Sequence, residues 1–353
     1  MQTSTTVERT AARLNPRSWK KVLDTCSAPK EELDIVSRWL LIVRACVFQM
    51  TLTSAFIGGM LAAADLRAAR LPFNWPAFIL CAIGLVLAHA VNNMVNDYFD
   101  TAAGVDTDDY VRAQYAPHPI LAGIITKTGL RNAIVVANAV DILIGVALLL
   151  MLGPERGWPL LIFALSGLFI SVFYVAPPIR LKHHGLGEPG VFVVWGPLMI
   201  GGTYYAVAGS IRQEIFLACI PYAIVVTTVL IGKHIDKYQA DKARGIRTLP
   251  VILGESASKR LNQLLMIAFY VITALLIVLK TVGPWAALVA LALPRLVQSL
   301  RQYSQPRPDK YPDGTPMGPL WYVGVAFYHN KRAGILFVIG LILNLIFPVS
   351  LPF

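Results

Sequence analysis

The stretch VNNMVNDYFDTAAGVDTDDY, residues 91–110, closes a long apolar run with three asparagines and five aspartates. The run before it, from about residue 74 to 97, is long enough to cross a bilayer as a helix. Polar and charged groups inside a membrane bundle are costly and commonly mark a functional site. The stretch therefore predicts a membrane helix with a polar site at its end.

The rest of the chain is equally apolar. Its 353 residues are 56% hydrophobic and 14% charged, whereas a soluble domain carries about 25% charged residues. The hydropathy pattern predicts an all-α, polytopic membrane protein with nine transmembrane helices. The predicted spans cover about residues 40–64, 74–97, 133–152, 158–176, 190–208, 215–233, 263–281, 284–299 and 333–350.

Positive charges are unevenly distributed over the connections between these spans. Nearly all Lys and Arg residues lie in the N-terminal arm and in every second connection, and the positive-inside rule then places the N-terminus in the cytoplasm. The net charge of +11 is explained by this topology and by attraction to anionic lipid, so no nucleic-acid partner is needed. The opposite connections hold only Arg67, Arg70, Arg156, Arg212 and Lys280.

Residues 1–38 are polar and are expected to form an N-terminal arm ahead of a membrane domain at residues 39–353. The arm has no short apolar core with a cleavage site, so we expect no signal peptide. We expect a flexible segment followed by a surface helix around residues 31–38. The four cysteines lack metal-type spacing and are expected to be inert thiols. They are Cys26, Cys46, Cys81 and Cys219.

On a helix, the polar side chains of the opening stretch share one face. An arc of about 100° holds His89, Asn93, Asn96, Asp97 and Asp100. Gly104 then allows the chain to turn before Asp106. Mg²⁺ is usually held by one or two carboxylates together with substrate phosphates, so the arrangement predicts a magnesium site. A solvated acidic helix end with asparagine caps is the alternative.

A second charged segment, GKHIDKYQADKARGIRTLPVILG, spans residues 232–254. Cations beside a magnesium site commonly hold phosphate oxygens and stabilise a phosphorylated leaving group. An ordinary positive loop with i,i+4 pairs is the alternative. Together the two segments predict a diphosphate bridged by Mg²⁺ between two helix ends, above an apolar cavity that protects a carbocation from water. On one helix, a shared face would carry Lys233, Lys237, Asp241 and Arg244, with Asp236 beside it.

These features resemble the UbiA superfamily of intramembrane prenyltransferases over about residues 38–350. The family has nine helices and a first motif NDxxD followed by a further Asp, which NDYFDTAAGVD at residues 96–106 matches. The resemblance implies a helical bundle around a central, lipid-facing cavity. It also implies that Mg²⁺ and diphosphate are bound by Asn96, Asp100 and Asp106, with Asp97 and Asn93 nearby.

The second family motif, DxxxDxxxG, is matched less closely. Asp241 and Gly245 fit it, but Lys237 stands where the first Asp is expected. The resemblance implies a metal ligand at Asp241, with or without Asp236, and leaves Lys237 to contact phosphate directly.

Three other segments bear on substrate binding. His118 stands where the family often has arginine, so a titratable group replaces a permanent cation, and Arg44 aligns with a first-span arginine. GLGEPGVFVVWGPLM, residues 185–199, resembles the branch that prenylates 1,4-dihydroxy-2-naphthoate in menaquinone synthesis. APPIRLK, residues 176–182, resembles branches with other acceptors. Candidate contacts to phosphate or acceptor are Tyr174, Arg180 and Lys182, although the two cations also fit as topology residues.

The expected reaction moves a polyprenyl group from its diphosphate to an aromatic acceptor near the cytoplasmic face, with Mg²⁺ as cofactor. Asp100, Asp241 and Lys237 are the expected catalytic residues, and Lys233 helps to neutralise the leaving group. A membrane terpene cyclase, or prenyl transfer to a non-aromatic lipid, is the alternative with the same diphosphate chemistry. A transporter would place ionisable groups near mid-membrane, whereas the carboxylates here cluster at one face.

Overall fold

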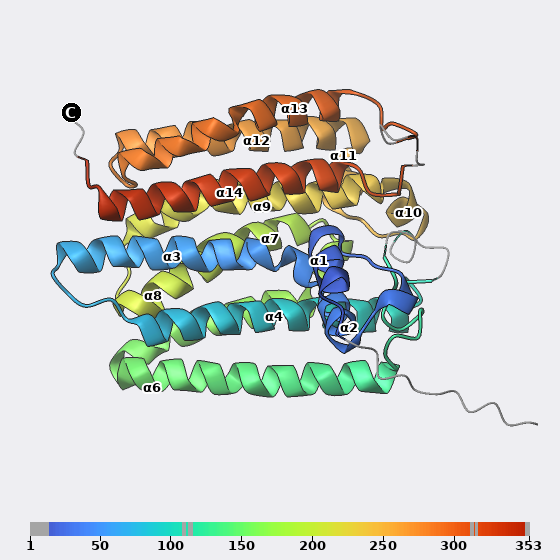
Figure 1. Ribbon diagram of the computed structural model, residues 1–353, viewed down its shortest axis with the longest axis horizontal. Coiled ribbons are helices and arrows are strands. Elements are labelled where there is room, and N and C mark those ends of the chain that lie inside the picture. Colours follow the sequence, from blue (N-terminus) through green and yellow to red (C-terminus); the bar gives the residue numbers. More distant parts are fainter. Residues whose placement is uncertain (1–13, 108–110, 112–115, 311–313, 315–316, 350–353) are drawn as a thin grey trace, which may run out of the picture.

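The computed structural model describes residues 14–107, 111, 116–310, 314 and 317–349. Long helices lie side by side, and two short N-terminal helices cross them on one face (Figure 1). Within the described residues, the only strand-like contact is an isolated bridge between His184 and Arg247. The predicted all-α fold class is confirmed.

The elements follow one another in a simple order along the chain. They are α1 (Pro16–Thr25), η1 (Lys30–Glu32), α2 (Ile35–Ile42), η2 (Ala45–Val47), α3 (Phe48–Ala68), α4 (Trp75–Ala102), α6 (Lys127–Phe173), η3 (Leu181–His183), α7 (Gly187–Val193), η4 (Val194–Gly201), α8 (Gly202–Ala208), α9 (Gln213–Asp236), α10 (Tyr238–Ala243), α11 (Leu249–Leu253), α12 (Glu255–Val278), η5 (Pro284–Ala292), α13 (Leu293–Ser304) and α14 (Tyr322–Ile346).

Seven helical segments in the described part of the chain are long and apolar enough to cross a membrane. The chain is therefore built as an integral membrane protein. The first span begins at Ala45, later than the predicted residue 40, because Arg44 adopts left-handed backbone angles (φ 53°) that interrupt the helix.

The predicted count of nine differs from seven at two places. α6 contains both the third and the fourth predicted spans, and Gly153 within it has non-helical angles (φ 75°, ψ 172°) that glycine tolerates best. The eighth predicted span is divided between η5 and α13, which follow each other directly and each carry a proline in the first turn. The nine-span count and the orientation of the N-terminus stay predictions.

α9 lies at the centre of the bundle and is buried along most of its length. It packs against α14, α12 and η4. Gly232 permits a close approach to α14, because a Cβ atom there would lie 2.8 Å from the carbonyl oxygen of Tyr322. The packing therefore fixes the end of α9 that carries Lys233 and His234.

Residues 14–42 are folded, which corrects the expectation of a flexible arm for this part of the chain. Asp34 links the two short helices, since its carboxylate accepts hydrogen bonds from the backbone N–H of Asn15 (2.6 Å) and from Trp19 Nε1 (2.7 Å). The expected surface helix at 31–38 is displaced to α2, where Asp34 is the N-cap. The small core between α1 and α2 consists of Val22, Ala28, Leu33 and Leu41.

Cys26 and Cys46 form a disulfide, with their Cα atoms 5.3 Å apart. The prediction of inert thiols is therefore wrong for this pair, because the fold of α1 and α2 brings together two residues separated by 20 positions. The other two cysteines, Cys81 and Cys219, are buried free thiols as expected.

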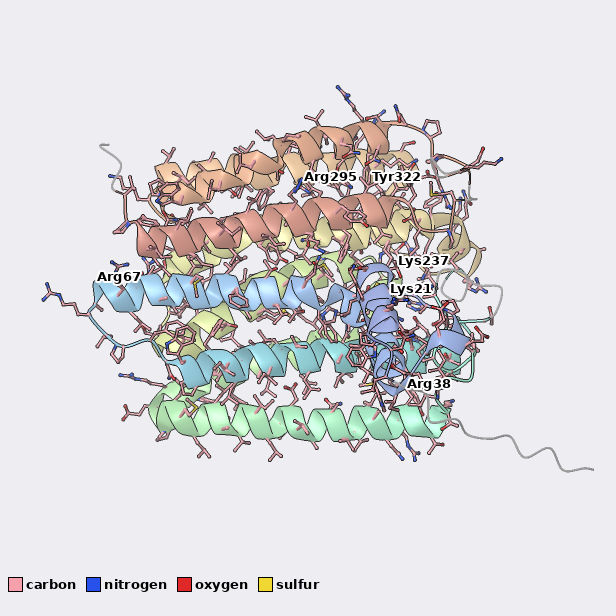
Figure 2. The ribbon with its side chains drawn as sticks, viewed as in Figure 1. Lys21, Arg38, Arg67, Lys237, Arg295 and Tyr322 are labelled. Carbon is pink, nitrogen blue, oxygen red and sulfur yellow. A yellow bond between two sulfur atoms is a disulfide. The ribbon has the colours of Figure 1, made fainter. Side chains whose placement is uncertain are left out.

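The two ends of the bundle carry different elements. Arg67 lies at one end, and Lys237 lies toward the other (Figure 2). The short helices α10 and α11 and the connection that follows α4 gather at the Lys237 end (Figure 1). The two charged segments of the sequence therefore lie at the same end of the molecule.

Candidate active site

A polar pocket lies between the last turns of α4 and α9, beside η3 and the residue that precedes η2. The sequence predicts every lining residue except His234. The lining residues are Arg44, Asn96, Asp100, Asp106, Tyr174, Lys182, Lys233, His234 and Lys237. The pocket thus combines carboxylates and an amide with several cations.

Asp100 and Lys182 form a buried ion pair in this pocket. The Asp100 carboxylate lies in the last turn of α4 and accepts a hydrogen bond from Lys182 Nζ at 2.7 Å. Burial alone would lower the pKa of Lys182, but the charge of Asp100 outweighs it and raises this pKa. Lys182 is therefore held as a cation against the first motif.

Arg44 reaches the same helix from the N-terminal side. Its guanidinium forms an ion pair with Asp97, whose side chain is buried. Asn93 donates a hydrogen bond from Nδ2 to the carbonyl oxygen of Val43 (3.0 Å), which fixes the backbone next to Arg44. Asn93 does not line the pocket, and its contact is to the backbone beside Arg44.

Asp106 is brought back to α4 by the turn after the helix. Gly104 has a positive φ (68°), and the backbone N–H groups of Val105 and Asp106 both donate to the carbonyl oxygen of Asp100. This local geometry explains how Asp106 joins Asp100, six residues earlier, in one pocket.

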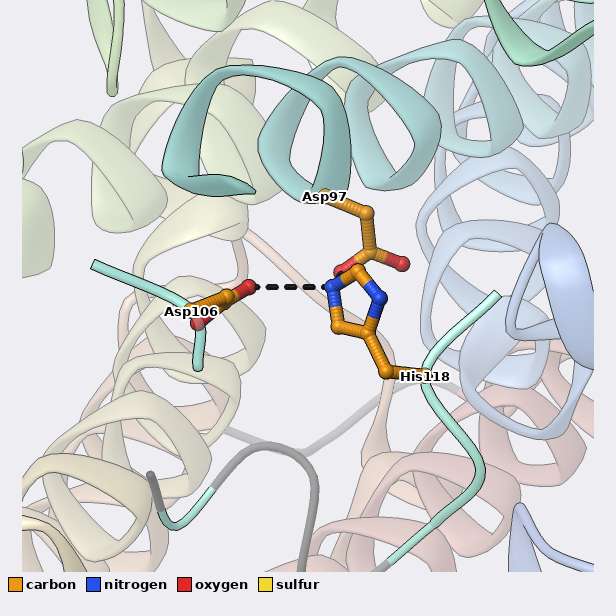
Figure 3. A group of neighbouring side chains, drawn as sticks. All are labelled: Asp97, Asp106 and His118. Carbon is orange, nitrogen blue, oxygen red and sulfur yellow. Dashed lines mark hydrogen bonds and ion pairs between the residues drawn. The ribbon is translucent and has the colours of Figure 1, made fainter. Parts of the chain in front are cut away.

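His118 lies between Asp97 and Asp106 (Figure 3). Its Nε2 is 3.2 Å from Asp106 and 3.7 Å from Asp97, while its Nδ1 accepts weak hydrogen bonds from the backbone N–H groups of Ile120 and Leu121. This pattern assigns the ring proton to Nε2, which donates to Asp106. Burial alone would raise the pKa of Asp106, but the hydrogen bond from His118 outweighs it and lowers this pKa.

The second charged segment is not one continuous helix. α9 ends at Asp236 and α10 begins at Tyr238, with Lys237 at the joint. Lys237 Nζ lies 3.6 Å from the fully buried carboxylate of Asp241, and Arg244 donates to the hydroxyl of Thr107 in the first motif's loop (2.9 Å). Burial lowers the pKa of Lys237 in spite of the opposing charge of Asp241. The two motifs are therefore joined by polar contacts.

Six predicted site residues do not line the pocket: Asn93, Asp97, His118 and Asp241, described above, and Asp236 and Arg180. Asp236 accepts hydrogen bonds from the backbone N–H groups of Tyr322 and Val323, both at 2.9 Å, and so caps the start of α14. Arg180 is exposed and has left-handed backbone angles (φ 46°) just before η3. Asp108 and Asp109, which follow the first motif, lie outside the described residues.

The sequence prediction missed a buried pair beside the pocket. His234 Nδ1 lies 2.7 Å from Glu188 Oε1, and the residues are 2% and 1% exposed. The signal was present as a glutamate and a histidine at the edges of two apolar predicted spans, at 190–208 and 215–233, where ionisable groups call for an explanation.

The donor set suits Mg²⁺, which prefers oxygen ligands and tolerates few carboxylates. The Asn96 Oδ1 atom is buried with no hydrogen-bond partner among the described residues, and it belongs to the same pocket as Asp100 and Asp106. Asp97, Asp106 and His118 also bring one ligand-type atom each within 4.8 Å of one another. An oxygen-binding cation would satisfy the buried amide and reduce the repulsion between neighbouring carboxylates.

Comparison with known sequences agrees with this geometry. The model of the UbiA prenyltransferase family matches residues 52–312. A 2-carboxy-1,4-naphthoquinone phytyltransferase from Synechocystis is 29% identical over 230 residues, covering 65% of this chain and 70% of that protein. A 1,4-dihydroxy-2-naphthoate octaprenyltransferase from Bacillus subtilis is 22% identical over 269 residues, covering 76% and 81%.

Solved structures share the fold. A UbiA homolog from Aeropyrum pernix K1 in its apo form superposes with a TM-score of 0.63 at 17% identity, covering 84% of this chain and 97% of that one. A UbiA homolog from Archaeoglobus fulgidus bound to GPP and Mg²⁺ superposes with a TM-score of 0.54 at 12% identity, covering 85% and 99%.

Proposed function

The chain belongs to the UbiA prenyltransferase family, and we propose that it transfers a polyprenyl group from its diphosphate to a dihydroxynaphthoate-like aromatic acceptor in quinone biosynthesis. The observation that carries the proposal is the pocket, in which metal-type oxygen ligands face several cations. Such a pocket suits a magnesium diphosphate better than it suits either ion alone. The excess of positive charge at this end of the helical bundle supports a site at the cytoplasmic face of the membrane.

The pocket residues divide the work of holding the donor. Asn96, Asp100 and Asp106 would hold Mg²⁺, with Asp97 and Asp241 beside them as further carboxylates. When bound, the metal would supply charge neutralisation for the diphosphate. The cations would contact diphosphate oxygens directly, stabilising the leaving group as the carbon–oxygen bond breaks. These cations are Arg44, Lys182, Lys233 and Lys237.

The acceptor half of the proposal rests on the relatives and on the chemistry of the reaction. Two relatives are named for prenyl transfer to carboxylated naphthalene compounds. An electron-rich ring is the natural nucleophile for an allylic cation, and a site closed around both substrates would keep water from competing. Tyr174 lines the pocket and is a candidate contact to the acceptor ring.

The test crosses a panel of aromatic acceptors with allylic diphosphates of several chain lengths, using membranes that contain the protein and Mg²⁺. We expect prenylated product with dihydroxynaphthoate-type acceptors and little product with unrelated phenols. Hydrocarbon or terpene alcohol formed without any acceptor would overturn the proposal and favour a membrane terpene cyclase.

A further inference from the structure

A histidine and a glutamate form a buried pair that the diphosphate site does not use. Glu188 lies in the first turn of α7, and His234 lies in the last turn of α9. The side chain of His234 is 3% exposed and that of Glu188 is 1% exposed, and a hydrogen bond of 2.7 Å joins them. Burying such a pair is costly, so its presence beside a catalytic pocket calls for a function.

The pair is oriented so that only the histidine reaches the pocket. His234 is one of the lining residues, and Glu188 lies behind it. With Nδ1–H donating a hydrogen bond to the Glu188 carboxylate, the lone pair of the imidazole ring lies on Nε2. The same arrangement orients the histidine base in hydrolases that use a histidine and a carboxylate.

The position of His234 along α9 suits the reacting carbon of the donor. His234 precedes Lys237 by three residues, so it lies about 4.5 Å deeper along the bundle. Lys237 lies toward the end of the bundle with the charged segments (Figure 2). Lys233 also lines the pocket and precedes His234 by one residue, so a diphosphate held between Lys233 and Lys237 would place its first carbon beside His234.

The other groups in the pocket are poorly suited to accept a proton. Asp100 is paired with Lys182, and Asp106 accepts the hydrogen bond from His118. Burial and the charge of Glu188 raise the pKa of Tyr174 well above its ordinary value, so its hydroxyl stays protonated. Since Lys182, Lys233 and Lys237 are assigned to the diphosphate, His234 remains as the base among the lining residues that the structure describes.

We propose that His234, oriented by Glu188, is the catalytic base that takes the hydroxyl proton of the aromatic acceptor; this rests on the proposed prenyl transfer. The acceptor O–H bond breaks, and its electron pair forms a carbonyl. The ring π pair forms the new carbon–carbon bond to the allylic carbon. The donor's carbon–oxygen bond breaks, and its electron pair leaves with diphosphate. The proton resides on His234 Nε2, and the Glu188 carboxylate stabilises the imidazolium.

The test uses purified protein in detergent with Mg²⁺, an allylic diphosphate and naphthols of graded hydroxyl acidity. His234→Gln should lower kcat by roughly 10²–10⁴-fold for the least acidic acceptor, with a smaller loss for more acidic ones. Binding of an uncleavable thiolodiphosphate analogue should change less than about threefold, because the donor contacts are intact. Glu188→Gln should show the same dependence on acidity, and His184→Gln, an exposed histidine, should match the wild type.

The outcomes separate this inference from the function on which it rests. A wild-type protein that prenylates no aromatic acceptor would refute the proposed function itself. If the wild type forms product, a His234→Gln variant with unchanged kcat would overturn only the role of His234. A loss of the same size for every acceptor would also overturn it, because a purely structural defect does not depend on hydroxyl acidity. If the histidine variant does not bind the donor analogue, the Glu188→Gln series decides by the same criterion.

Discussion

Replacing Lys237 by aspartate tests how the second motif operates, because it places a carboxylate at the first Asp position of the DxxxDxxxG pattern. Lys237 Nζ lies 3.6 Å from Asp241 Oδ1, and the two residues are 6% and 0% exposed. At an effective dielectric constant of about 20, two unit charges at this separation interact by about 4–5 kcal/mol. The substitution turns this attraction into a repulsion of similar size.

We expect the Lys237→Asp variant to need less Mg²⁺ and to be less stable without it. A repulsion of even half that size, about 2 kcal/mol, corresponds to a roughly thirtyfold lower half-saturating Mg²⁺ concentration when a bound cation relieves it. The assay is thermal unfolding in detergent over a Mg²⁺ titration, with inorganic diphosphate present. Lys242→Asp is the matched control, since it makes the same charge change at an exposed position beside Asp241. Superimposable titrations for the wild type and Lys237→Asp would refute the reasoning.

Three further predictions follow from single contacts. Asp100→Ala should abolish turnover while the protein stays folded by circular dichroism, and normal diphosphate release would refute the site assignment. Reducing the disulfide between Cys26 and Cys46, or replacing Cys26 by serine, should lower the free energy of unfolding by about 3 kcal/mol, because the disulfide closes a loop of 20 residues. The Cys219→Ser variant, measured with and without reductant, controls for the treatment. Asp34→Ala removes the carboxylate that accepts hydrogen bonds from Asn15 and Trp19, so it should lower the free energy of unfolding by about 1–3 kcal/mol. The variant should also be cleaved faster by protease in the segment before α3, and an unchanged cleavage rate would contradict this.

Much of the fold could be predicted because long apolar runs leave few structural options in a membrane. The first motif was equally accessible, since helical spacing and Gly104 bring Asn96, Asp100 and Asp106 to one pocket. The rest of the site was harder to predict because its residues are far apart in the sequence. Lys182 pairs with Asp100 across 82 residues, and nothing in the local pattern of either segment specifies that contact.

Other differences have equally local causes. On an ideal continuous helix, Asp236 would lie beside the charged face of the second segment. In the structure α9 ends at Asp236, and the Asp236 carboxylate caps α14. His234 and Glu188 come from helices whose packing fixes their contact, 46 residues apart in the chain. The pairing of Cys26 with Cys46 depends on how α1 folds back, which hydrophobic periodicity does not encode.

The most direct test of the central claim is equilibrium binding of an uncleavable allylic thiolodiphosphate to the purified protein. The pocket of metal-type oxygens and cations predicts saturable binding with Mg²⁺. It also predicts affinity at least about a hundredfold weaker after chelation of the metal or in Asp100→Ala, equivalent to roughly 2.7 kcal/mol. Equal affinity under all three conditions would contradict the account, because the diphosphate would then bind without the residues that define the site.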